Sequence, residues 1–368
     1  MTTDVHEPVL ETPPKKPLPR RILGWVIRLV AGAVILIWIL PRFIDYREVW
    51  AALQHISPFE FLLLLSLSLL RVLTESSIYR ALLRGLSLRT GARAYLSYDA
   101  IGQVLPPGAP EVVLYTYFDS AGFDTETATA GVVGSFIFAT LGRLVIWPVA
   151  YVLLLAHARP PERTEIITAA SLLVLGAVAI VGWALVRWES SAALIGTWTS
   201  RIASWVRARF GRGPVVDLGP TLTRFRAATV SVLAQRWKLA SGAVALNMLV
   251  SYVLLLVALR SVGVSSDSLP WVDVFGAFAL AFWLATVAPI NGSGVGVTDV
   301  VLISTLTDVS GDSSSDITAA VLIWRLFYSF AMLPLGLYTL SQWRKDNPTF
   351  FRRHAGPALD SGEAVPAG

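Results

Sequence analysis

Four of the charged residues in or beside the apolar stretches of the sequence follow an order that repeats. Glu111 and Asp299 each follow a break rich in proline or glycine, and Arg143 and Arg325 each lie on the next apolar stretch. An unpaired charge at the centre of a bilayer costs at least about 2.5–3.5 kcal/mol, so each of these side chains needs a partner or water. Either they line a polar cavity, where they contact a charged substrate group or relay protons, or they form buried ion pairs of Glu111 with Arg143 and of Asp299 with Arg325.

The backbone at the two breaks, 106–111 and 289–296, is a second candidate for binding. A new helix is expected to begin after each break, so that its unpaired N–H groups and the positive end of its dipole can receive a phosphate or carboxylate. The glycines also suit a tight turn with positive φ, and their spacing does not match a nucleotide-binding loop. The candidate binding residues are Glu111, Arg143, Asn291, Gly292, Ser293, Gly294, Gly296, Asp299 and Arg325.

The residue types give little support for a metal site, a cofactor or an enzymatic reaction. The chain has no cysteine, and its four histidines fall in expected tails or loops without paired spacing, so we expect no metal, no cofactor and no enzymatic activity. The net charge of +5 comes from basic residues beside apolar stretches, which indicates membrane topology and not a nucleic-acid partner. Arg71 and Glu75, one helical turn apart, are expected to form a local pair near the membrane surface.

The elements that must position these residues are membrane helices. Hydrophobic residues make up 54% of the 368 residues and charged residues 15%, which is typical of a polytopic membrane protein. The two broken stretches, 95–118 and 271–306, are expected to enter and leave the membrane on one side, because each arm of the first would cover only about half the hydrocarbon. Stretches long enough to cross about 30 Å of hydrocarbon lie at 22–40, 59–79, 127–155, 166–186, 239–259 and 317–340.

The predicted fold is therefore all-α: a polytopic membrane protein with six transmembrane helices plus two oppositely oriented re-entrant helical hairpins, like an inverted repeat. With both hairpins re-entrant, 21 Lys and Arg residues outside the spans face the cytoplasm and 5 face outward, whereas two full crossings would give 15 and 11. The positive-inside rule favours re-entry, with both termini cytoplasmic.

A single membrane domain is expected over 22–343. It consists of a first half, 22–186, a cytoplasmic amphipathic linker, 187–238, and a second half, 239–343. Two disordered cytoplasmic tails are expected, a basic one at residues 1–21 and a second one at residues 344–368.

Three motifs support a family resemblance. They are Tyr79-Arg80-Ala81-Leu82-Leu83-Arg84-Gly85, the stretch from Leu105 to Glu111, and the stretch from Pro289 to Asp299. Together with the late helix around Arg325, these motifs resemble in order and spacing the flippase-like transmembrane region of lysylphosphatidylglycerol synthases. That region also occurs in stand-alone bacterial membrane proteins. The resemblance covers nearly all of residues 22–340.

This chain departs from the motifs of that family at several positions. Gly108, Pro110, Leu114 and Thr298 stand where the family usually has an arginine or, at Pro110, a glycine, and Asp299 stands for its glutamate. Arg143 and Arg325 are then the chief cations of the expected site. Little but a polar tail follows position 340, so lipid aminoacylation is not expected of this chain.

The resemblance implies a multi-pass protein of the bacterial inner membrane that binds and translocates a lipid or lipid-linked precursor with a charged headgroup, without covalent chemistry. The expected partners are membrane lipids, with an anionic phospholipid and a polyprenyl-linked precursor as candidates, and a homo-oligomer is left open. Two alternatives remain. One is a secondary transporter of a small anion, and the other is a non-transporting accessory of an enzyme of envelope lipid or glycan synthesis.

Overall fold

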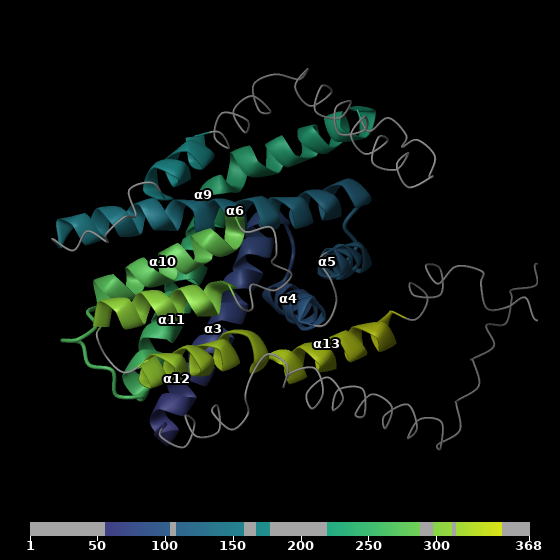
Figure 1. Cartoon of the computed structure of the whole chain (residues 1–368). Helices are drawn as coiled ribbons and strands as arrows, with labels where there is room; N and C mark the ends of the chain where they lie inside the picture. The colour runs from purple at the N-terminus through teal and green to yellow at the C-terminus, as the bar shows by residue number, and fades with distance from the viewer. Residues whose placement is uncertain are drawn as a thin grey trace, which may run out of the picture. The chain divides into compact units, whose positions relative to one another are not determined.

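A computed structural model of the chain describes residues 56–103, 108–157, 167–176, 219–287, 297–310 and 314–347, all within one compact unit, Arg47–Gly368. These ranges contain helices and no strands. Figure 1 shows the helices, and its labels are used below. Their bounds are α3 Pro58–Leu82, α4 Leu88–Gly102, α5 Ala109–Ser120, α6 Thr125–Ala156, α9 Gly219–Ser261, α10 Trp271–Val287, α11 Val297–Ser310, α12 Ser314–Arg325, the π-helix η3 Leu326–Phe330 and α13 Leu333–Asp346.

Four helical segments in these ranges are long and apolar enough to cross a membrane, and they contain four of the six predicted spans. The predicted span 22–40 lies outside the described residues, and of 166–186 only the short apolar helix Ile167–Gly176 is described. The chain is therefore a multi-pass helical membrane protein. The four segments are Pro58–Leu82, Thr125–Ala156, Arg236–Ser261 and Ser315–Asp346.

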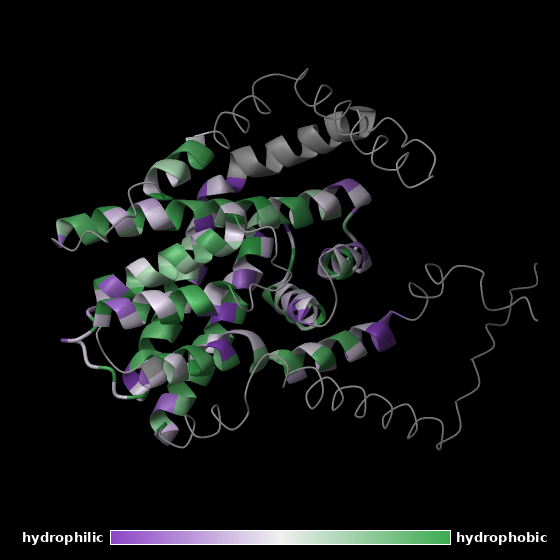
Figure 2. Ribbon diagram, in the orientation of Figure 1, coloured by the Kyte–Doolittle hydropathy of each residue, from purple (hydrophilic) through white to green (hydrophobic). Residues whose placement is uncertain are grey.

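The outward faces of these segments are apolar. Leu62 of α3 is 61% exposed, Val152 of α6 is 63% exposed and Leu249 of α9 is 52% exposed. Figure 2 shows that hydrophobic residues predominate along the helices. Apolar side chains on faces that the protein does not bury suit helices surrounded by lipid.

The helices α3 and α9 pack along each other in the main hydrophobic core. The start of α3 is fixed by a capping box, in which Ser57 Oγ accepts the Glu60 N–H at 3.3 Å and the Glu60 carboxylate accepts the Ser57 N–H at 2.8 Å. Asn247 of α9, which is buried, donates to Thr74 Oγ1 of α3 at 2.8 Å. Because lipid is as apolar as the core, close packing and such interhelical hydrogen bonds must hold the spans together.

Two pairs of shorter helices form hairpins, α4 with α5 and α10 with α11. The first hairpin packs against α3, α6 and α13, and the second against α6 and α12. Pro110 lies in the first turn of α5, where the missing N–H of proline removes no helical hydrogen bond. The predicted break before Glu111 therefore coincides with the start of a helix.

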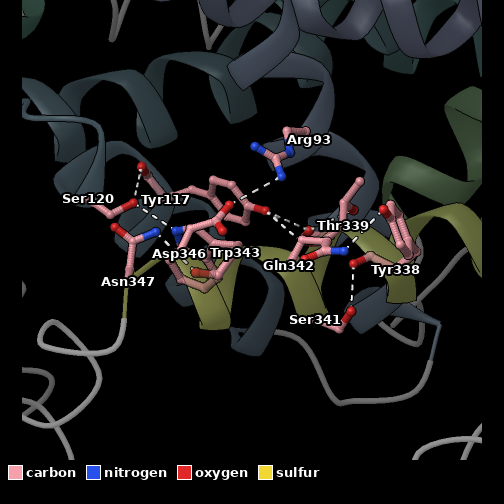
Figure 3. Close-up of polar contacts among 11 residues, drawn as sticks. Arg93, Tyr117, Ser120, Tyr338, Thr339, Ser341, Gln342, Trp343, Asp346 and Asn347 are labelled. Atoms are coloured by element: carbon pink, nitrogen blue, oxygen red, sulfur yellow. Dashed lines mark hydrogen bonds and ion pairs between the residues drawn. The ribbon is translucent and has the colours of Figure 1, made fainter. Parts of the chain in front are cut away.

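Both ends of the α4–α5 hairpin contact the last turns of α13 (Figure 3). Arg93, in the first half of α4, has its Nη2 atom 3.5 Å from Asp346 Oδ2. Trp343 Nε1 donates to Ser120 Oγ, at the end of α5, at 2.8 Å, and the Trp343 ring stacks on Tyr117 at 4.1 Å between centroids. The chain thus enters and leaves this hairpin at the same end of α13.

The last span is interrupted at η3, where the Ala331 N–H bonds to the Leu326 carbonyl, five residues back, at 2.8 Å. Two carbonyls of this π-turn accept hydrogen bonds from α3: Ser68 Oγ donates to the Phe327 carbonyl at 2.8 Å, and Arg71 donates to the Tyr328 carbonyl. A π-turn widens the helix and shifts the register of every residue after it. The side chains of α3 therefore satisfy backbone groups that this widened turn presents to them.

Candidate functional site

The second half of the chain contains a buried ion pair between α11 and α12. Arg325 donates from Nε to Asp299 Oδ1 at 2.8 Å, and its Nη2 lies 2.6 Å from the same oxygen. The Arg325 side chain is 4% exposed and the Asp299 side chain 19%. The guanidinium also lies 3.5 Å from Ser329 Oγ and 5.0 Å from the Trp324 ring centroid. Of the two alternatives for these residues, the structure bears out the ion pair, and it joins the second hairpin to the last span.

The first half is built differently, and the ion-pair alternative is wrong for Glu111 with Arg143. Gly108, with φ of 99°, precedes α5, and Glu111 Oε2 accepts the Gly108 N–H at 2.9 Å. A carboxylate three residues into a helix can satisfy a free N–H at the helix start, and it also favours the positive end of the dipole. Glu111 therefore has a local role at the start of α5.

Arg143 lies near the middle of α6. Within the described part of the chain it donates no hydrogen bond and forms no ion pair, and its Nε atom is buried without an acceptor. Its charge interacts at longer range with Glu75 of α3 and with Tyr98 of α4. Arg143 is thus a cation that the described residues attract but do not bind.

Small residues bring α6 close to its neighbours. A Cβ atom at Gly131 would lie 2.8 Å from Leu83 Cδ2, and one at Gly142 would lie 2.5 Å from Val244 Cγ1 of α9. Both distances are shorter than ordinary Cβ contacts, so a larger residue at either position would force the neighbouring side chain to shift. α6 thus packs closely against Leu83 near Gly131 and against α9 next to Arg143.

Arg71 and Glu75 do not form the predicted local pair. The buried Arg71 guanidinium donates to the Tyr328 carbonyl and lies 4.1 Å from the centroid of the Tyr328 ring and 5.6 Å from that of Tyr95. Aromatic faces attract a desolvated cation, so these rings and the π-turn hold Arg71 in place. Glu75 is left between the charges of Arg71 and Arg143.

Asp99 of α4 completes a group that sequence reasoning missed. It interacts electrostatically with Arg71 and with Glu75. An acid inside the apolar stretch 95–118 was a readable signal, but its partners lie on other helices. We refer to the buried Arg71 and the partly buried Glu75, Asp99 and Arg143 as the charge cluster.

The cluster contains two arginines and two carboxylates from three helices. Full ionisation would make its formal charge zero, which reduces the cost of holding these groups away from water. The two arginines of the cluster differ in their contacts. Arg71 is held by a carbonyl and two rings, whereas Arg143 has no hydrogen-bonding partner among the described residues. An anion could therefore bind Arg143 without displacing an existing hydrogen bond.

The remaining predicted residues are not placed. Asn291, Gly292, Ser293, Gly294 and Gly296 lie outside the described residues. Among the residues that are described, no group of three or more His, Asp or Glu side chains is placed to hold a metal ion.

Comparison with known proteins gives one result. The model of the family described as the lysylphosphatidylglycerol synthase TM region matches residues 25–336. That region is the non-catalytic part of the synthases. No curated protein is significantly similar to the chain.

Proposed function

Because the chain belongs to the family of the lysylphosphatidylglycerol synthase transmembrane region, we propose that it binds a membrane lipid with a charged headgroup and moves it across the bilayer. The observation that carries this proposal is the state of Arg143. It lies at mid-helix in a span, and its buried Nε has no acceptor in the described part of the chain. A phosphate or carboxylate oxygen would supply one.

The two halves then have different roles. In the second half, Arg325 is already satisfied by Asp299, so this pair holds the hairpin and the last span together. In the first half, Arg143 contacts the headgroup, and Glu75 keeps its guanidinium attracted to α3 when no anion is bound. The acyl chains remain in the hydrocarbon throughout, and no covalent step is involved.

The hairpins are proposed to be re-entrant, the first from the cytoplasm and the second from outside. The contacts of Arg93 and Ser120 with the same end of α13 support this for the first hairpin. The excess of basic residues on one side supports cytoplasmic termini in a bacterial inner membrane. Headgroups would enter the hydrated space between the two hairpins.

The test is a flipping assay with purified protein in liposomes that contain fluorescent phosphatidylglycerol. Arg143→Gln should abolish most of the movement that the parent catalyses, because glutamine keeps a polar side chain but loses the charge and the reach of the guanidinium. Arg344→Gln, at an exposed position near the end of α13, is the matched control and should flip like the parent. Normal flipping by well-folded Arg143→Gln would exclude this role. A parent that moves no lipid but crosslinks to a stable partner would instead identify an accessory protein.

A further inference from the structure

An apolar groove runs between α6 and α9 and has a volume of about 460 Å³. Its floor is formed by buried side chains, among them Ile146, Val244 and Met248. Except for Ser241, every residue that lines it is apolar or glycine. The volume lies within the roughly 300–1,000 Å³ range of pockets that bind small molecules.

The groove opens sideways, toward the surroundings of the spans. Val145, Val149 and Leu249 line its mouth and are 40%, 47% and 52% exposed. Both α6 and the part of α9 that lines the groove belong to segments long and apolar enough to cross a membrane. The mouth therefore faces hydrocarbon, and its occupant must be apolar along this length.

The length of the groove suits a hydrocarbon chain. It extends along α6 from Phe138 to Val149, which is about 17 Å at 1.5 Å per residue. Half of the roughly 30 Å hydrocarbon core is about 15 Å, so the acyl chain of a lipid in one leaflet matches this length.

Gly142 connects the groove with the charge cluster along α6. It lines the groove where α6 and α9 approach closely, since a Cβ atom at Gly142 would lie 2.5 Å from Val244 Cγ1. The next residue is Arg143, whose charge interacts with Glu75 of α3 and with Tyr98 of α4. An apolar channel and an available cation thus lie side by side on one helix, which matches the two ends of an anionic lipid.

We propose that this groove holds an acyl chain of the lipid whose headgroup contacts Arg143. That the bound lipid is also cargo rests on the proposed function. The chain would remain in the groove between α6 and α9 while the headgroup lies against α3 and α4.

The probe is phosphatidylglycerol with a diazirine on one acyl chain, present at a low fraction in phosphatidylcholine nanodiscs that hold the full chain. After irradiation, mass spectrometry should find adducts concentrated on peptides that contain 138–149 and 241–249. Val145→Trp should lose this labelling because the indole fills the mouth. Val152→Trp, two turns away on the exposed face of α6, should keep it.

Adducts spread evenly over exposed apolar positions, including Leu172 and Leu173, would show ordinary surrounding lipid and overturn the proposal. Unchanged labelling in Val145→Trp would overturn it as well. If Val145→Trp does not fold, Ala245→Trp on the opposite wall gives the same test.

Failure of the proposed function gives a different pattern. If the parent moves no lipid in liposomes but is labelled in the groove, the acyl-chain site is supported and only the transport role is excluded. If flipping depends on Arg143 but the labelling is diffuse, the transport role is supported and the acyl-chain site is excluded.

Discussion

At the scale of single residues, the intramembrane arginines Arg143 and Arg325 have unlike surroundings. Arg325 has a carboxylate at hydrogen-bonding distance and is almost fully buried, whereas from the described residues Arg143 has only longer-range attraction, chiefly from Glu75. Removing one member of a buried ion pair leaves the other uncompensated, while replacing both with apolar groups can be neutral. The Asp299–Arg325 pair is therefore open to a test of stability that is separate from transport.

Asp299→Asn and Arg325→Gln should each lower the free energy of unfolding by about 3 kcal/mol, because each leaves a buried charge without its counterion. The double variant Asp299→Leu, Arg325→Met should recover most of that loss. Equilibrium unfolding in lipid or mild detergent measures both effects. If the single variants were as stable as the parent, the pair would have no structural role, and Arg325 would become a candidate for headgroup contact.

Residue-level predictions from the sequence failed where local and distant partners compete. Glu111 stands three residues after Gly108, a spacing that favours capping the start of a helix, and this local bond wins over a partner on α6. Asp299 has Arg325 as its partner on the next helix along the chain, so the order of the charged residues in the sequence was sufficient to suggest this pair. The contact of Arg71 with Tyr328 joins residues 257 positions apart, and only the packing of α3 on the π-turn brings them together.

At the scale of elements, long apolar runs predicted α3, α6, the apolar part of α9 and the last span to within a few residues. Hydropathy analysis depends only on the length and polarity of a segment, and both can be read from the sequence of that segment alone. The π-turn at η3 was not predictable in that way, because the stretch 317–340 reads as one continuous helix. Its widening is balanced by Ser68 and Arg71 of another helix, which hydropathy does not register.

The register after this π-turn sets how closely α13 approaches α4. A Cβ atom at Gly336 would lie 2.3 Å from the Leu96 carbonyl oxygen, which is backbone and cannot move aside. Gly336→Ala should therefore cost about 1–3 kcal/mol of stability through overpacking. Gly242→Ala, on α9 with nothing within 4 Å of the new atom, should be neutral or stabilise by up to about 1 kcal/mol. Thermal unfolding of the two variants makes the comparison, and equal effects would mean that α13 and α4 are not in tight contact.

At the scale of the whole molecule, the contacts of the helix ends fit one arrangement in the membrane. Arg93 and Ser120 both contact the end of α13, and Arg236 Nη1 donates to the Arg80 carbonyl at 3.4 Å, which joins the end of α3 to α9. His157, after the far end of α6, meets the Trp271 ring at 5.5 Å, at the start of the second hairpin. These two groups of ends are separated by the lengths of the spans, so each group should lie on one side of the bilayer.

Because the chain has no cysteine, single cysteines can report the side of each loop without a background of native thiols. Arg89→Cys and Ala121→Cys, at exposed positions before and after the first hairpin, should both react with a membrane-impermeant maleimide only when the cytoplasmic face is accessible. Ser266→Cys, exposed in the loop before α10, should react only from outside. These outcomes follow because a re-entrant hairpin returns to its own side, whereas a full crossing reverses every loop that comes after it. Labelling of Ala121→Cys from outside and of Arg89→Cys from the cytoplasm would mean that α4 and α5 together cross the membrane, and the hydrated space proposed between the two hairpins would then not exist.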